Sequence, residues 1–258
     1  MKTIDNTIKY YELLMIYNNT EVFFNYSLPS GYHFEYYKDG DLLDWVNIHI
    51  SSGEFTSIDS GIKIFHDFYD NFISELDKRC IFIVDDKNKE KVGTVTVSLL
   101  SQEEYGCLAT VDWLAIKKKY QGKGLAKPLI SKTIRLANEL GHKKILLHTQ
   151  TTTWLAAKLY LDFGFEPLNV SDDFGWRILK TITNHKKLSS FHKLDNDEIY
   201  DKRNIEIEKK LISIYGSDKF NYNVWYKDGR NDVEVYYKGV SDVYEYYYND
   251  GKIKLVKK

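Results

Sequence analysis

The most regular pattern of apolar and polar positions lies between residues 111 and 165. A short apolar run at Val111–Ile116 precedes a glycine-containing turn, and apolar residues then recur at helical spacing over Leu125–Leu140. A second short run at Lys144–Thr149 leads into a second helical pattern at Trp154–Tyr160. The periods predict a strand, a glycine turn, a helix, a strand and a helix, in that order.

The residues before and just after this stretch predict further strands and helices. Residues 10–17 fit either a strand or a short helix. Asp41 is a candidate N-cap for a helix that reaches His49, and Asp59 or Ser60 is a candidate N-cap for a second helix. The other predicted strands are Tyr32–Tyr37, a hairpin of Cys80–Val84 with Val92–Leu100, and a closing pair of Glu166–Leu168 with Trp176–Ile182.

The pattern changes after a polar connection that begins at His185. A helix is predicted over Asp195–Tyr215 with Gly216 as its stop. Four strand-like runs follow, with hairpin turns at Asp228-Gly229 and Asp250-Gly251. They are Tyr222–Tyr226, Val233–Tyr237, Val243–Tyr248 and Ile253–Val256. We therefore predict a main domain of residues 1–184 and an accessory domain of residues 185–258, a helix on an antiparallel meander with aromatic side chains on both faces.

The glycine turn has the properties of an anion-binding site. Pro128 lacks an amide hydrogen and is tolerated only in the first turn of a helix, so the helix begins between Gly122 and Ala126. The free amides of that first turn and the helix dipole favour a bound anion. Gly122 and Gly124 have no Cβ, so a phosphate can approach the backbone closely. The surrounding lysines are Lys117, Lys118, Lys119, Lys123 and Lys127. We expect a phosphorylated cofactor; an ordinary loop and a nucleotide site are the alternatives.

The turn lacks the third glycine of a dinucleotide fingerprint and the Gly-Lys-Ser/Thr of a P-loop. Its spacing, Gln121-x-x-Gly124-x-Ala126, resembles the Gln/Arg-x-x-Gly-x-Gly/Ala turn of the GNAT superfamily of acyl-CoA-dependent N-acyltransferases. Downstream, the sequence is similar to that family's Asn-x-x-Ala-x-x-x-Tyr-x-x-x-Gly-Phe segment. Its matching residues are Ala156, Tyr160, Gly164 and Phe165, and Thr153 occupies the asparagine position. The resemblance is clear over about residues 80–180.

The resemblance implies a GNAT-like mixed sheet flanked by helices, which with the accessory domain gives an α/β fold carrying a small C-terminal α+β domain. It also implies acetyl-CoA as cosubstrate, with its pantetheine arm between two splayed strands, Ala109–Ile116 and Lys144–Thr149. The arm would bond to backbone groups of Leu114 and Ile116. The full set of expected cofactor-binding residues is Leu114, Ile116, Gln121, Gly122, Lys123, Gly124, Leu125, Ala126 and Thr153.

Two residues are expected to be catalytic. Tyr160 occupies the position at which the family often has a tyrosine that protonates the departing thiolate, and a phenol suits that role. Its alternative role is a packed helix tyrosine. Asp112 is a carboxylate inside an apolar strand, where charges are rarely buried without a reason. It would take the amine's proton or hold a cationic acceptor; a salt-bridged strand residue is the alternative. Glu54 and His148 are weaker candidates.

Composition limits the other functions. The formal charge of −1 provides no global attraction to nucleic acid or to a membrane surface. The seven histidines include no pair at metal-ligand spacing, so no metal is expected. Two cysteines, Cys80 and Cys107, fit buried thiols in a reducing cytoplasm.

These observations predict an N-acetyltransferase that moves an acetyl group to a primary amine by direct transfer in a ternary complex. The identity of the amine is open, and so is homodimer formation. The alternative from another class is a CoA-binding or sensing module without turnover, whose C-terminal domain serves interaction.

Overall fold

The computed structural model describes residues 4–98, 109–168, 170–171, 173–225, 231–249 and 251–258. Internal contacts divide the chain into two compact units that interleave along the sequence. The large-sheet unit comprises Leu13–Thr149 and Leu159–Asn169, and the small-sheet unit comprises Met1–Glu12, Gln150–Lys158 and Val170–Lys258. The predicted domain boundary between residues 184 and 185 stays a prediction. It concerns which part of the chain folds independently, and the division into two compact units does not test that.

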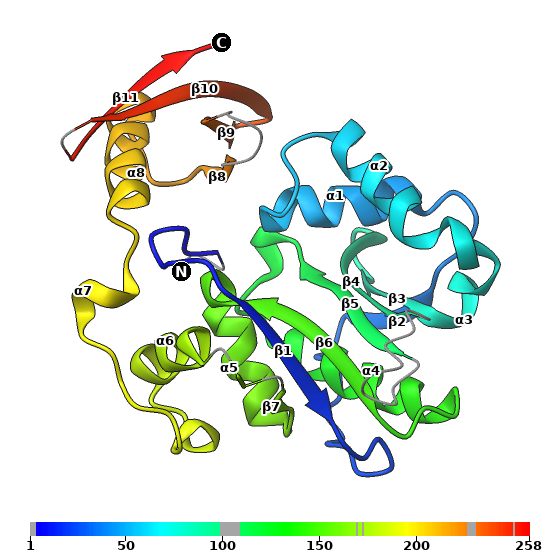
Figure 1. The fold of residues 1–258 in the computed structure, drawn as a ribbon. Coiled ribbons are helices and arrows are strands. Elements are labelled where there is room, and N and C mark those ends of the chain that lie inside the picture. Colours follow the sequence, from blue (N-terminus) through cyan, green and yellow to red (C-terminus); the bar gives the residue numbers. More distant parts are fainter. Residues whose placement is uncertain (1–3, 99–108, 169, 172, 226–230, 250) are drawn as a thin grey trace. The chain divides into compact units, whose positions relative to one another are not determined.

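A seven-stranded mixed sheet forms the large-sheet unit, in the order β2-β3-β4-β5-β6-β1-β7 (Figure 1). Its strands are β1 (Glu12–Tyr17), β2 (Tyr32–Tyr36), β3 (Cys80–Asp85), β4 (Glu90–Ser98), β5 (Thr110–Ile116), β6 (Ile145–Gln150) and β7 (Glu166–Leu168). β5 and β6 pair in parallel, whereas the β2–β3, β3–β4, β4–β5 and β1–β7 pairs are antiparallel. The predicted α/β class is confirmed, and residues 12–17 form a strand rather than a helix.

The centre of the sheet is buried on both faces. All of β3 is buried, and so is β4 from Val92 to Ser98. β3 is a continuous apolar run, which is typical of a strand covered on two sides, whereas β4 alternates valine with threonine and is nevertheless buried on both faces. Cys80 is a fully buried free thiol. Cys107 and the predicted strand end at Leu99 and Leu100 lie outside the described residues.

The helices of this unit are α1 (Leu42–Ser52), α2 (Ile58–Tyr69), α3 (Leu76–Arg79) and α4 (Ala126–Glu139), and α5 (Trp154–Phe163) spans residues of both units. The predicted cap of α2 at Asp59 or Ser60 is wrong. Ser57 caps this helix: its backbone is extended and its hydroxyl accepts from the Ser60 amide at 3.1 Å. α1 and α2 pack against each other, and α1 packs on β4 and β5.

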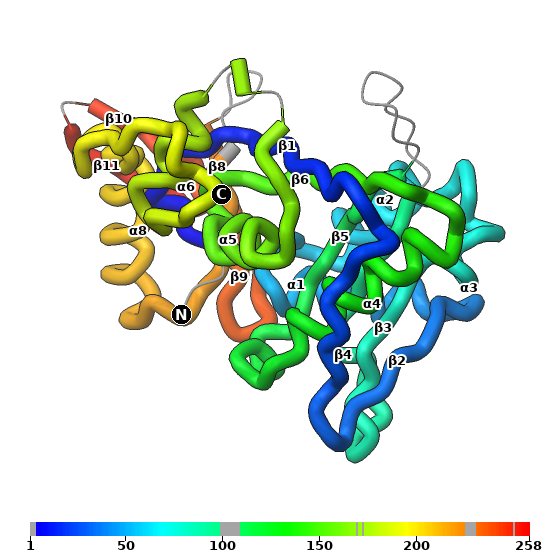
Figure 2. The backbone as a smooth tube through the Cα atoms, turned by 90° about the horizontal axis from the view of Figure 1, so that it is seen from below, coloured from blue at the N-terminus to red at the C-terminus, as the bar shows by residue number. Residues whose placement is uncertain are grey.

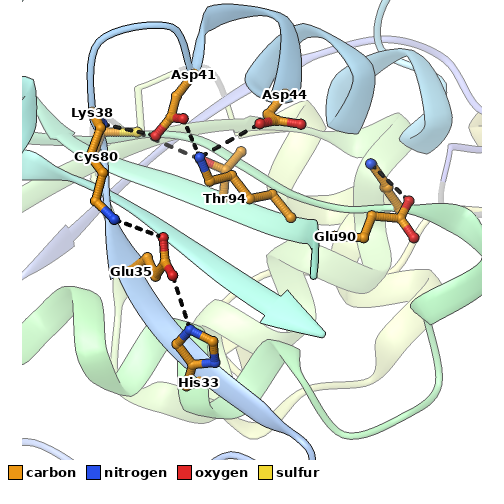
Figure 3. Close-up of polar contacts among 10 residues, drawn as sticks. His33, Glu35, Lys38, Asp41, Asp44, Cys80, Glu90 and Thr94 are labelled. Carbon is orange, nitrogen blue, oxygen red and sulfur yellow. Dashed lines mark hydrogen bonds and ion pairs between the residues drawn. The ribbon is translucent and has the colours of Figure 1, made fainter. Parts of the chain in front are cut away.

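A polar network fixes the start of α1. Asp41 precedes the helix and accepts from the Lys38 amide at 2.8 Å, and Lys91 of β4 pairs with both Asp41 and Asp44. Figure 3 shows Asp41 and Asp44 turned toward one shared amino group, with Glu35 between His33 and Lys38 nearby. Because Lys91 is only 12% exposed, the pair with Asp41 is shielded from solvent and ties α1 to β4.

The predicted strand at Trp176–Ile182 is wrong, since Phe174–Thr183 forms α6 in the small-sheet unit. Trp176 and Leu179 are buried three residues apart, the spacing of one helix face. A short apolar run fits both the period of a helix and the period of a strand, so the sequence pattern did not distinguish the two here. The partner of β7 is β1, with Leu14 opposite Leu168.

The small-sheet unit contains a four-stranded antiparallel sheet in the order β11-β10-β9-β8 and a helix, α8 (Lys202–Tyr215). The strands are β8 (Asn221–Trp225), β9 (Asp232–Tyr237), β10 (Val240–Asn249) and β11 (Lys252–Lys257). The predicted single helix at 195–215 is wrong, because α7 (Asn196–Ile199) ends before Asp201, whose side chain caps α8. Asp228-Gly229 and Asp250 lie outside the described residues.

The core of this unit joins one face of the sheet to α8. Ile207 and Leu211 of the helix pack with buried aromatics that include Tyr244 and Tyr246. Tyr247 is 47% exposed and, by strand alternation, points to the opposite face. No helix in the described part of the chain is long and apolar enough to cross a membrane.

Candidate active site

The turn between β5 and α4 requires two residues in the left-handed region. Gly122 has φ 76° and Gly124 has φ 79°, values that strain any residue with a Cβ. A Cβ at Gly122 would meet no atom within 4 Å, and one at Gly124 would meet only Pro29 Cγ at 3.8 Å. The protein therefore leaves space beside both glycines, which keeps the backbone open to a ligand.

The first turn of α4 offers unpaired amides. Leu125 is its N-cap and supplies no side-chain hydrogen bond, unlike Ser57 of α2. No hydrogen bond found in the described residues uses the amides of Ala126 and Lys127, and Pro128 has none to offer. Donors left free at the positive end of a helix dipole form a site for phosphate oxygens.

Part of the lysine charge near the turn is already neutralised. Lys117 and Lys119 both pair with Glu90, at 3.0 and 2.8 Å. Partial burial raises the pKa of Glu90, but hydrogen bonds from Lys119, Lys117 and Tyr120 outweigh it and hold that pKa at about 2. Lys123 instead lies over the Tyr120 ring, 4.4 Å from its centroid. Lys123, a predicted cofactor-binding residue, takes part in none of the described ion pairs. Within those pairs, therefore, no carboxylate neutralises its charge.

β5 and β6 pair over only a short stretch of their length. Their register consists of Thr110 with Leu146 and Val111 with Leu147, although both strands continue beyond these residues. At this point the β4–β5 register shifts and Trp113 adopts φ 54°, which marks a bulge in β5. A bulky residue at positive φ is uncommon and often accompanies a functional site. From Asp112 onward, the edge of β5 that faces β6 has no strand partner in the described residues.

The predicted backbone contacts of Leu114 and Ile116 lie on that free edge. Lys117 donates to Val92 of β4 at 2.8 Å. Antiparallel pairs alternate between bonded and non-bonded, so Ile116 and Leu114 direct their backbone groups away from β4. The Gln121 side chain donates to the Ile116 carbonyl at 2.9 Å. Gln121 therefore connects the glycine turn to the end of β5 and leaves the Ile116 amide available.

Tyr160 lies on α5 and is 8% exposed, with its ring 5.8 Å from that of Phe165. No hydrogen bond to its hydroxyl is found in the described part of the chain. Burial raises the pKa of Tyr160, and the negative charge of Glu54 raises it further. The phenol therefore keeps its proton at neutral pH, with a carboxylate close enough to influence it.

Asp112 lies in a different environment. Burial raises the pKa of its carboxyl group, and a hydrogen bond from the Thr110 hydroxyl at 2.7 Å opposes that shift. Burial raises the pKa of Tyr69, a buried α2 tyrosine whose hydroxyl donates to Thr96, and the charge of Asp112 adds to that shift. His148 contributes a smaller, opposing charge. Of the two predicted carboxylates, Glu54 is the one whose charge raises the pKa of Tyr160.

Glu54 is held by a residue that the sequence did not single out. His49, the last basic residue of α1, is fully buried, and its Nδ1 is hydrogen-bonded to a carboxylate oxygen of Glu54. Its Nε2 is buried without a partner in the described residues. The Glu54 side chain itself is 30% exposed, so the carboxylate can meet a ligand from solvent.

Thr153 belongs to the small-sheet unit, in a short 3₁₀ turn before α5. Its hydroxyl donates to the Gln150 carbonyl at 3.0 Å and takes part in a reciprocal capping box with Gln150. This explains locally why threonine suits the position. Its predicted contact with the cofactor stays a prediction.

Comparison with known proteins gives a match to one family model over part of the chain. Residues 77–167 match the family model described as an acetyltransferase (GNAT) domain. These residues contain β3, β4, the bulged β5, the glycine turn and α5. This part of the chain is therefore similar to a GNAT acetyltransferase domain.

The chain covers only part of the length of each relative that follows. The chain is 35% identical over 74 residues to GCN5-related N-acetyltransferase 4, chloroplastic, of Arabidopsis thaliana, covering 29% of this chain and 25% of that protein. A solved GCN5-related N-acetyltransferase from Sphaerobacter thermophilus has 13% identity and a TM-score of 0.51, covering 63% of this chain and 49% of that one. A GNAT-family acetyltransferase from Colwellia psychrerythraea has 14% identity and a TM-score of 0.46, covering 63% and 55%.

The Sphaerobacter structure supports the fold, and the match to the family model supports acetyl transfer as the general reaction. The match spans a quarter of the curated relative's length and about half of the Sphaerobacter structure. Among the described residues, no cluster of three or more His, Cys, Asp or Glu is arranged to hold a metal ion.

Proposed function

We propose that the GNAT domain transfers an acetyl group from acetyl-CoA to a primary amine by direct attack in a ternary complex. The observation that carries the proposal is the uncapped start of α4, behind two glycines at positive φ with open space beside them. In this proposal the amides of Leu125, Ala126 and Lys127 receive the pyrophosphate, and Lys123 adds charge.

The pantetheine arm would lie along the unpaired edge of β5. An extended chain of amides can add to a strand edge by main-chain hydrogen bonds, as a further strand would. The backbone groups of Leu114 and Ile116 that point away from β4 are the partners we assign to it. In this proposal the thioester lies near the bulge at Trp113, because the arm runs from the glycine turn back along β5.

Glu54 is the base in this proposal, with Asp112 as the alternative. An amine must lose a proton as it attacks the thioester carbon, and a carboxylate within reach of solvent and substrate can take it. Glu54 is partly exposed, whereas Asp112 is engaged with Thr110 in a strand. The proton goes from the amine nitrogen to the carboxylate while the new C–N bond forms.

Tyr160 is the acid. As the C–S bond breaks, the phenol gives its proton to the CoA sulfur, and the tetrahedral intermediate collapses to the amide. The Glu54 charge raises the pKa of Tyr160. Once Glu54 has accepted the amine's proton, that charge is gone, and the phenol becomes a better acid at the moment when the thiolate leaves.

The test is thiol release from acetyl-CoA in the presence of a panel of primary amines, with mass spectrometry of the products. We expect amine-dependent CoA release and a product 42 mass units heavier than the acceptor, the mass that replacing one hydrogen by an acetyl group adds. CoA binding without release for any amine would favour the sensing module instead. Competition by ATP but not by CoA would favour a nucleotide site.

A further inference from the structure

His49 and Glu54 form a buried pair at the end of α1. The imidazole is fully buried while the carboxylate side chain is 30% exposed, so the pair has one inner and one outer member. Nδ1 of His49 bonds to Oε2 of Glu54. The other carboxylate oxygen, Oε1, has no hydrogen bond in the described residues and is the one left for a ligand.

Backbone hydrogen bonds also hold His49 and Glu54 together. The His49 carbonyl accepts from the Glu54 amide at 2.9 Å and from the Gly53 amide at 3.1 Å. The Ser52 hydroxyl donates to it at 2.9 Å. Gly53 ends the helix at φ 100°, so the chain turns back over His49. Glu54 therefore starts from a fixed backbone position, and the bond from His49 fixes its side chain as well.

Aromatic rings enclose the far side of the imidazole. The ring centroids of Trp45, Phe55 and Trp113 lie 4.2, 5.2 and 5.4 Å from that of His49. Nε2 has no polar partner in this enclosure. A proton on Nε2 would be a buried donor without an acceptor, which is costly, so the packing favours the tautomer with its proton on Nδ1. In that form His49 donates one hydrogen bond to the Glu54 side chain.

We infer that His49 is a positioning residue that orients the Glu54 carboxylate toward the acceptor amine. The inference rests on the proposed function, because it requires that Glu54 takes the amine's proton. The competing role for His49 is structural, as a filler of the aromatic cluster and an anchor for the turn. The two roles differ in one consequence: orientation matters only while Glu54 is a carboxylate.

Three variants separate the roles in the full-length protein. His49→Phe keeps an aromatic ring in the cluster and removes the donor. His49→Asn keeps an amide N–H near the Nδ1 position and removes the ring. Glu54→Gln removes the base. His66→Phe on α2 is the matched control, because His66 also pairs with a carboxylate, Asp70 at 2.7 Å, but is 47% exposed.

We expect His49→Phe to lower kcat on the order of 10²-fold, because misplacing a reacting group by about 1 Å has that effect, with little change in KM for acetyl-CoA. His49→Asn should recover most of the loss, and His66→Phe should leave kcat unchanged. In the Glu54→Gln background, His49→Phe should cause no further loss, since positioned and positioning groups are not additive.

A structural role predicts the opposite: His49→Asn loses more than His49→Phe, and the losses from Glu54→Gln and His49→Phe multiply. Either result overturns the inference even if acetyl transfer is established. A second readout needs no turnover. The ¹⁵N shifts of the His49 ring should show a proton on Nδ1, and Glu54→Gln should change the Nδ1 signal. A ring protonated on Nε2 alone would contradict the inference directly.

Discussion

Two turns next to helices carry the proposed chemistry, and they work in opposite ways. The turn before α4 contains Gly122 and Gly124 at positive φ and leaves its amides unpaired. The turn after α1 contains Gly53 at positive φ, and its amides close onto the His49 carbonyl. The first turn presents backbone donors to a ligand. In the second turn the backbone donors are hydrogen-bonded to the His49 carbonyl, and the group available to a ligand is the Glu54 side chain.

The difference shows how the two halves of such a site are built. A diphosphate is the same in every substrate complex, so a fixed set of amides can bind it without side-chain specificity. An acceptor amine needs one carboxylate at one position, and this must be held by packing and hydrogen bonds from elsewhere in the fold. Changes in the first turn should therefore alter cofactor binding, and changes around the second should alter turnover.

Tyr160→Phe is expected to have the largest effect on turnover. It removes only the hydroxyl, so kcat should fall on the order of 10² to 10⁴-fold, as for the loss of a general acid. CoA affinity, measured by calorimetry, should stay the same because the glycine turn is untouched. Wild-type kcat in this variant would show that Tyr160 is a packing residue.

The comparison of Glu54 with Asp112 identifies the base. Glu54→Gln should lower kcat by at least about 10²-fold, whereas Asp112→Asn should change kcat by less than about tenfold, with any change in Tm set by the Thr110 hydrogen bond. Steady-state kinetics with the best acceptor, together with melting curves, measures both. If Asp112→Asn is the inactive variant, the assignment of Glu54 as base is wrong.

Glu90→Gln should have a moderate effect that depends on pH. The pKa of Glu90 is lowered from its ordinary value of 4.5 to about 2 in the folded protein. A lowered pKa stabilises the fold above pH 4.5, and this stabilisation is lost as the pH falls toward 2. The Tm difference between wild type and Glu90→Gln should therefore be largest near pH 7 and shrink on acidification. A difference that grows at low pH would contradict the lysine network around Glu90.

The smallest effect on the cofactor site is expected from removing the chain after Lys187. Within the small-sheet unit, residues after Lys187 bond to N-terminal residues, since Asn6 donates to Tyr222 at 2.6 Å and Asp201 donates to Thr7 at 2.7 Å. Truncation removes these partners, so we expect a lower Tm with CoA affinity retained. Complete loss of CoA binding would mean that the predicted boundary at 184 is wrong and that the C-terminal residues belong to the catalytic fold.

The sequence predicted the elements whose signals are local. The strand, glycine turn and helix from β5 to α4 follow from a short apolar run, two glycines and Pro128, all within about 20 residues. The helical identity of α6 did not follow, because the apolar run Ile178-Leu179 fits both periods and only the burial of Trp176 and Leu179 decides. The His49–Glu54 pair did not follow either: the residues are close in sequence, but Trp113, which helps to enclose His49, comes from β5, far along the chain.

The central claim is that the amides of the turn before α4 bind the CoA phosphates. Calorimetric titration of CoA into wild type, Gly124→Val and Gly141→Val tests it most directly. Gly141 is the matched control, because it follows the other end of α4, has φ 86° and has no atom within 4 Å of an added Cβ. Both variants carry the same kind of backbone strain. Losing two hydrogen bonds to a charged group costs about 3 to 6 kcal/mol, so Gly124→Val should weaken binding by at least about 10²-fold and Gly141→Val should not. Equal CoA affinity in the two folded variants would contradict the account.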